Sequence, residues 1–267
     1  MNASVASFPK GLMVSQSGYT FSLAQTTLAP GRQVPLEFRI LGPDGKPVTA
    51  YDVEHAKRLH LIAVRRDFSG FQHVHPHMDT DGTWRSTLDL TPGPWRLFAD
   101  FKATDGEALT LGADVAVPGD YVPEGREVNS RASTVGGYSV TLHGDLTVGA
   151  EAALTLEMTR GGRPVTDLQP YLGAYGHLVA LRDGDLAYLH VHPQGAPGDG
   201  KTQPGPNILF FTEVPSPGRY HLYLDFKHKG VVRTAAFAVT VSGAAGHESS
   251  ETSHSEESHE HSDSSGH

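Results

Sequence analysis

Three histidines recur at one spacing in both halves of the sequence. The two triplets are His60, His73, His75 and His177, His190, His192. Neutral imidazole is the commonest side-chain ligand for zinc, copper and nickel. Two histidines two residues apart on a strand point to one face, and a third on the neighbouring strand completes a three-nitrogen set. Each triplet therefore predicts a metal site within its own half of the chain.

Other side chains extend this prediction. Asp100 and Asp225 lie in a later matched segment and can supply an oxygen ligand. The first half alone adds His77 and Met78, and a thioether there would favour copper over zinc because it is a soft ligand. A structural alternative stays open: His-Val-His-Pro can simply end a strand at Pro76, with the imidazoles bonded to aspartates or backbone carbonyls.

The sequence from residue 243 holds five further histidines and almost no apolar side chain. These histidines are His247, His254, His259, His261 and His267. Such a segment cannot bury enough surface to offset its ordering entropy, so we expect a disordered acidic tail. Histidine-rich tracts often bind metal loosely, and a purely solubilising role is the equal alternative.

A hairpin is expected to position the second triplet. The Asp-Gly pair at 183–184 is a strong signal for a two-residue type I′ turn. In that register His177 faces His190, with His192 diagonal to the pair on the same face. A loop centred one residue later makes His177 face His192 instead. Either register keeps the triplet on one face, whereas a loop of odd length would send His177 to the other.

The triplets belong to a longer internal repeat. The segment from His60 to Pro76 matches residues 177–193 without a gap, and residues 92–102 match residues 217–227. The second offset is larger, which places an eight-residue insertion in the Gly/Pro-rich loop 194–206. Two copies of one unit therefore follow each other along the chain.

Both copies have the pattern of strands. Leu36, Phe38 and Ile40 alternate with charged residues, and the same period of two appears near residue 156. Short strands separated by turn signals favour an all-β fold with two tandem immunoglobulin-like or cupredoxin-like sandwiches. The expected organisation is a flexible N-terminus (1–11), copy one (12–118), a linker (119–136), copy two (137–241) and the tail (242–267).

Composition excludes several classes of function. The formal charge of −9 gives no basic footprint for nucleic acid, and the absence of cysteine removes disulfides and thiolate sites. No stretch is apolar enough to span a membrane, and residues 1–16 do not have the pattern of a signal peptide. No nucleophile elbow, P-loop or dinucleotide fingerprint is present, so we do not expect an enzyme.

The segments LHLIAVRRDFSGFQHVHP, EALTLGADVAVPGDY and YLGAYGHLVALRDGDLAYLHVHPQGAPGDG also carry a resemblance. The chain resembles, over residues 12–241, a mainly actinobacterial family of secreted or membrane-anchored tandem β-sandwich proteins that are loosely labelled heavy-metal-binding. The resemblance implies metal handling outside the cytoplasm. It also implies an N-terminal export segment, which the sequence as given lacks.

These observations lead to three hypotheses. The first is a non-enzymatic, extracytoplasmic protein that binds copper or zinc and buffers the ion or passes it to another metal-handling protein. The second is a structural or adhesive β-sandwich module without a ligand, which would bind partners through loops or sheet edges. The third is a metalloenzyme that uses histidines and a carboxylate around an open coordination position.

Overall fold

The computed structural model describes residues 9–125, 129–189 and 191–242, and these form strands without any helix. The strands of the first repeat are β1 (Ser15–Gln16), β2 (Tyr19–Leu23), β3 (Gly31–Leu41), β4 (Leu59–Arg65), β5 (Gln72–Val74), β6 (His77–Met78), β7 (Trp84–Leu90), β8 (Gly93–Lys102) and β9 (Ala108–Val117). The expected all-β fold is thereby confirmed. No helix in the described part of the chain could cross a membrane.

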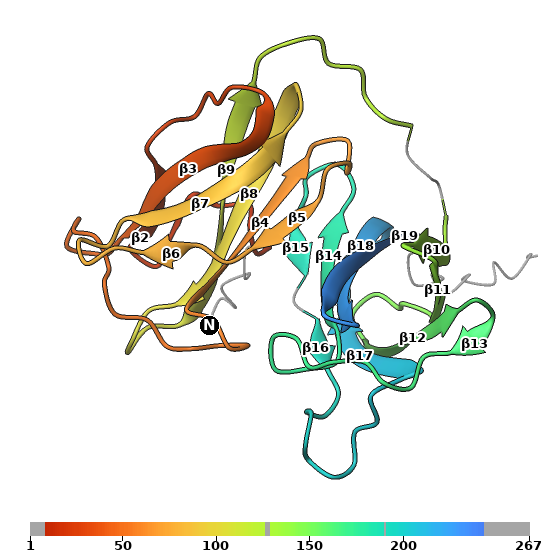
Figure 1. Ribbon diagram of the computed structural model, residues 1–267. Helices are drawn as coiled ribbons and strands as arrows, with labels where there is room; N and C mark the ends of the chain where they lie inside the picture. Colours follow the sequence, from red (N-terminus) through yellow and green to blue (C-terminus); the bar gives the residue numbers. More distant parts are fainter. Residues whose placement is uncertain (1–8, 126–128, 190, 243–267) are drawn as a thin grey trace, which may run out of the picture.

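The second repeat has the same plan (Figure 1). Its strands are β10 (Ala132–Val135), β11 (Tyr138–His143), β12 (Glu151–Arg160), β13 (Arg163–Pro164), β14 (His177–Arg182), β15 (Tyr188–Leu189), β16 (His192–Pro193), β17 (Asn207–Glu213), β18 (Gly218–His228) and β19 (Val231–Val241). Strand β10 lies inside the segment 119–136 that the sequence predicts to be linker. It pairs with β11 as an edge strand, and its short, half-exposed sequence gives little apolar signal.

Each repeat is a sandwich of two antiparallel sheets. In the first repeat the strand orders are β1-β2-β3-β7-β6 and β5-β4-β8-β9. In the second they are β10-β11-β12-β17-β16, with β13 beside β12, and β15-β14-β18-β19. Separate apolar cores fill the two sandwiches, one around Phe38, Trp84 and Trp95 and the other around Tyr138 and Phe210. Each repeat therefore has the core of an independent domain.

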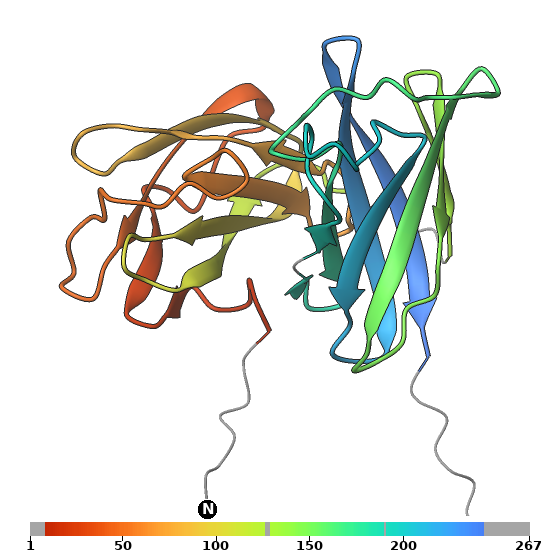
Figure 2. The same ribbon diagram turned by 90° about the horizontal axis from the view of Figure 1, so that it is seen from below.

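The two sandwiches lie side by side in both views (Figures 1 and 2). Successive residues of a strand point to opposite faces. In β4, Leu61 and Ala63 enter the core of the first repeat, whereas Ile62 and Val64 join a third apolar cluster. That cluster contains residues of both repeats: Ile62, Val64, Phe68, Phe98, Val179, Leu181, Leu186, Tyr188 and Tyr223. The β5-β4-β8-β9 sheet of the first repeat and the β15-β14-β18-β19 sheet of the second therefore bury their outer faces against each other.

This interface has an approximate two-fold symmetry. Phe71 and Tyr188 occupy equivalent positions in the two copies, as do Phe98 and Tyr223. Phe71 stacks on Tyr223 with ring centroids 4.0 Å apart, and Phe98 lies 5.7 Å from Tyr188. Such reciprocal contacts are the mark of an isologous interface, in which both partners use the same surface.

Candidate metal centre between the repeats

The first histidine triplet lies on the interface side of its sheet. Strand β5 pairs with β4 so that His73 is opposite Ile62, and His60 is two residues before Ile62 on the same face. His75 follows β5 directly, and its ring centroid lies 5.2 Å from that of His60. Strand pairing therefore gathers the three imidazoles, as the sequence predicts for this copy.

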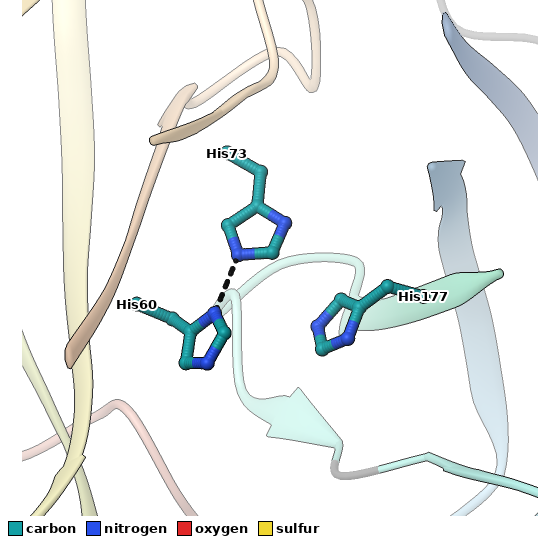
Figure 3. Close-up of side chains that lie close together, drawn as sticks. All are labelled: His60, His73 and His177. Carbon is teal, nitrogen blue, oxygen red and sulfur yellow. Dashed lines mark hydrogen bonds between the residues drawn. The ribbon is translucent and has the colours of Figure 1, made fainter. Parts of the chain in front are cut away.

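The second repeat contributes His177, the first residue of β14. Its position is equivalent to His60, and the centroids of these two rings are 5.5 Å apart. His60, His73 and His177 each offer one nitrogen, and these donor atoms all lie within 4.8 Å of one another (Figure 3). The sequence predicts a separate triplet in each repeat, whereas the structure forms one cluster from both. The difference follows from the docking of the two outer sheet faces.

Hydrogen bonds hold the cluster in order. The Nε2 of His60 lies 3.1 Å from the carbonyl oxygen of Glu54, which can only accept, so His60 carries its proton on Nε2. Burial and the neighbouring His73 lower the pKa of His60 to about 3, so the ring is neutral and its Nδ1 accepts. His73 therefore donates from Nε2 across 3.0 Å to that Nδ1.

The other nitrogen of His73 is anchored across the interface. Its Nδ1 lies 2.8 Å from Oδ2 of Asp225, and the two side chains are only 1% and 4% exposed. Thr234 donates to the second carboxylate oxygen at 2.6 Å. Carboxylates that bind the outer nitrogen of a histidine fix the ring for metal coordination. Asp225 is thus placed to orient His73 rather than to coordinate the ion.

His75 differs from its neighbours in its hydrogen bonding. Its Nε2 is buried and has no hydrogen-bond partner in the structure. Burial, followed by the proximity of His73 and His60, lowers the pKa of His75 to about 3, so the ring is neutral. A buried unpaired polar atom costs about 1–3 kcal/mol, and such atoms are uncommon in folded proteins.

Asp100 is the counterpart of Asp225 in the first repeat. It pairs in register with His60, as Asp225 does with His177. Its carboxylate accepts from the Thr110 hydroxyl at 2.9 Å, and burial raises its pKa to about 6. The structure therefore places both aspartates beside the cluster, and only Asp225 contacts one of its histidines among the described residues.

The register predicted first for the second hairpin, in which His177 faces His190, is wrong. Ala180 pairs with Leu189, which is the register of a loop centred one residue after the Asp-Gly pair at 183–184. The strand pairing then ends, and His192 lies in β16, where it pairs with Phe211 of the opposite sheet. His192 is exposed and does not join His177 on one strand face.

The physical reason lies in the side chain of Asp185. Its carboxylate binds the Arg182 guanidinium and accepts from the backbone N–H of Ala187 at 3.0 Å. The backbone N–H of Arg182 donates to the carbonyl of Ala187 at 2.9 Å, which closes the loop over residues 183–186. These contacts stabilise a four-residue loop in place of the two-residue turn.

Other predicted ligands lie elsewhere. Strand β6 pairs with β7 in the opposite sheet, because the chain changes sheets at Pro76. His77 is exposed there, and Met78 packs against the core of the first repeat, so its thioether does not enter the cluster. His190 and the tail histidines lie outside the described residues. Sequence reasoning favours a purely structural role for His55, because it has no counterpart in the repeat, yet its ring centroid lies 5.7 Å from that of His177.

The chain shares little sequence identity with the solved structures that it resembles. No curated protein matches the chain. The solved Escherichia coli adhesin FdeC is 16% identical over 86% of this chain and 65% of its own, with a TM-score of 0.27. A putative membrane-anchored protein from Corynebacterium diphtheriae is 10% identical over 86% and 60%, with a TM-score of 0.25. This chain thus spans less than two thirds of either structure.

A family model also matches the sequence, in two segments that each contain one of the sandwiches. The matched residues are 14–119 and 133–243, which together make up most of the chain. The two matches confirm the internal repeat. The chain therefore belongs to the family described as domain of unknown function DUF8832, which it contains twice.

Proposed function

We propose that this protein is a non-enzymatic metal-binding protein that holds a copper or zinc ion between its two repeats. The observation that carries the proposal is the convergence of His60, His73 and His177 from both sandwiches, with donor nitrogens within 4.8 Å of one another. Imidazole nitrogens suit both metals. The ion would be buffered, or passed to another metal-handling protein, and the resemblance to secreted and membrane-anchored proteins supports a role outside the cytoplasm.

The arrangement supports binding more than catalysis. The side chains at the centre of the cluster are buried, with His60 and His177 at 3% and 9% exposure. The apolar residues of the interface, including Ile62 and Val179, lie on the same strands. A catalytic zinc needs an open position for water and substrate. A buried cluster between two docked sheets suits retention of an ion, so the enzyme hypothesis is the weakest of the three.

A structural role is the second candidate. The hydrogen bonds from Glu54 through His60 and His73 to Asp225 are complete without an ion. In this reading the histidines join the two repeats, and the protein acts as a structural or adhesive β-sandwich module. Removal of the central histidines would then weaken docking of the repeats and leave metal content unchanged.

Metal content separates the two candidates. The test compares the full-length protein with the His60→Ala and His177→Ala double variant, both purified without a histidine tag and with the tail histidines replaced by asparagine. We expect one ion of zinc or copper per chain in the parent and less than one tenth of that in the variant. His77→Ala with His143→Ala, which removes two exposed histidines, is the matched control. Equal metal content in parent and double variant would refute the proposal.

A further inference from the structure

We infer that His75 is the fourth ligand of this centre, so that four imidazoles enclose one tetrahedral divalent ion of the zinc class. The inference rests on the proposed function and deepens it, because it selects the metal and closes the coordination sphere. It starts from the unpaired Nε2 of His75, a buried atom of a ring whose centroid lies 5.2 Å from that of His60 and 4.9 Å from that of His73. No other atom of the described residues satisfies this nitrogen.

Ring spacing supports a tetrahedral centre. An ion that lies about 2.05 Å from each nitrogen is about 3.2 Å from each imidazole centroid, so tetrahedral ligands place ring centroids about 5.2 Å apart. The centroid of His60 lies 5.2 Å from those of His73 and His75 and 5.5 Å from that of His177. The centroid of His73 lies 4.9 Å from that of His75 and 4.8 Å from that of His177. Five of the six pairs thus have nearly the required spacing.

The same distances argue against a square-planar centre. Planar ligands would place adjacent ring centroids about 4.5 Å apart and opposite centroids about 6.4 Å apart. Two of the six pairs would be opposite, so any five pairs include at least one such separation. The largest of the five observed values is 5.5 Å. Square-planar and tetragonal geometry is the preference of Cu²⁺, whereas zinc takes four ligands tetrahedrally.

The donor atoms of His60, His73 and His177 need only a small adjustment. Tetrahedral coordination places nitrogen atoms about 3.4 Å apart, so the widest donor separation in the triad would contract by at most about 1.4 Å. The Nδ1 of His60 and the Nε2 of His73 are already 3.0 Å apart, and the ion would replace the proton between them. Asp225 would keep its bond to the outer nitrogen of His73 and offset part of the ion's charge.

The chemistry of the donors also limits the ion. Soft thiolate and thioether ligands select Cu⁺. The chain has no cysteine, and the nearest methionine in the sequence among the described residues, Met78, packs against a core instead of the cluster. Four imidazoles leave no open position for a substrate, which makes the site a structural or storage centre. A divalent ion of borderline softness and tetrahedral preference is the class that fits.

Cobalt(II) tests this assignment, because tetrahedral cobalt absorbs visible light far more strongly than five- or six-coordinate cobalt. The parent is the full-length chain with the five tail histidines replaced by asparagine. We expect the intense tetrahedral bands when Co²⁺ alone is added, and their displacement by one equivalent of Zn²⁺. In His75→Ala the cobalt bands should lose more than half of their intensity, and zinc should bind at least tenfold more weakly.

His77→Ala is the matched control, since it removes an exposed histidine that is two residues from His75 along the chain but lies in the opposite sheet. It should leave the bands and the affinity unchanged. His75→Asn is a second variant that keeps a polar side chain at this position. Circular dichroism of both variants checks that they are folded. If the parent binds cobalt and His75→Ala or His75→Asn has the same spectrum and affinity, His75 is not a ligand and only this inference fails. If the parent binds none of cobalt, zinc and copper, the proposed function fails with it.

Discussion

The hydrogen bond between Asp225 and His73 leads to a prediction for which the equivalent residue of the first repeat, Asp100, provides a control. Asp225→Asn keeps the shape of the side chain and removes its charge. The bond to His73 is 2.8 Å long and the carboxylate is 4% exposed, so screening by water is weak. A hydrogen bond to a charged group contributes about 1.5–3 kcal/mol, and the amide oxygen retains part of it. We expect the metal-free variant to lose about 1–1.5 kcal/mol of unfolding free energy, which is the difference between a charged and a neutral hydrogen bond.

The same substitution should weaken metal binding. Residues that orient a metal-binding histidine are typically worth about 10–100-fold in affinity, because they fix the ring and raise its basicity. Asp100→Asn is the matched control, since Asp100 occupies the equivalent position and is bonded to Thr110. Burial raises the pKa of Asp100 to about 6, so its ionised form is unfavourable in the fold and its removal should not destabilise the protein at neutral pH.

The assays are denaturant unfolding of the metal-free proteins at neutral pH and zinc competition against a chromophoric chelator. We expect Asp225→Asn to have a lower unfolding free energy and a lower zinc affinity than the parent. Asp100→Asn should be as stable as the parent or more stable. Equal losses in the two variants would mean that Asp225 contributes only as a buried polar group. The reasoning about an oriented His73 would then be wrong.

Three further predictions concern the tail, pH and the interface. Deletion of residues 243–267 should leave the melting temperature within about 1 °C of the parent, since changes away from a core have small effects on stability. The deletion should also lower the number of copper or zinc ions bound per chain. An unchanged number of bound ions would mean that the tail histidines only increase solubility. The pKa values of His60 and His75 in the folded protein are each about 3, below the ordinary value of 6.5. Between pH 3 and 6.5 the unfolded chain therefore binds more protons than the folded protein does. Stability of the metal-free protein should therefore fall as pH drops from 6.5 towards 3 in urea titrations, and a flat profile would contradict the buried neutral rings. Leu181→Ala, at a side chain with 0% exposure in the interface, should cost about 2–5 kcal/mol by calorimetry, whereas the exposed Val232→Ala should cost less than about 0.5 kcal/mol.

Most of the fold is predictable from the sequence because its signals are local. Alternation in β3 and β12, turn residues and the matched segments lead to two β-sandwiches with separate cores. The edge strand β10 escapes prediction because it is short and half-exposed. The hairpin after β14 escapes it because side-chain contacts of Asp185, rather than the Asp-Gly pair, determine the loop.

The candidate site is predictable in part. Within the first repeat, the spacing of His60, His73 and His75 leads directly to one shared face. The joining of His177 to them depends on how the two sandwiches dock, which residue spacing within one repeat does not encode. One signal was present, since β4 and β14 are apolar on both faces, and a strand with two apolar faces needs a covering layer on each side. The second layer is the other repeat.

The two-fold arrangement of the interface makes the chain the equivalent of a homodimer whose subunits have been fused. In a true homodimer, every substitution appears twice, so a residue on the axis meets its own copy and a site beside the axis exists in duplicate. Fusion removes this constraint. One half can keep the set of His60, His73 and His75 while the other changes its loops, as the insertion at 194–206 and the hairpin after β14 illustrate. A fused chain can therefore form a single asymmetric centre on a symmetric scaffold, which two identical chains cannot do.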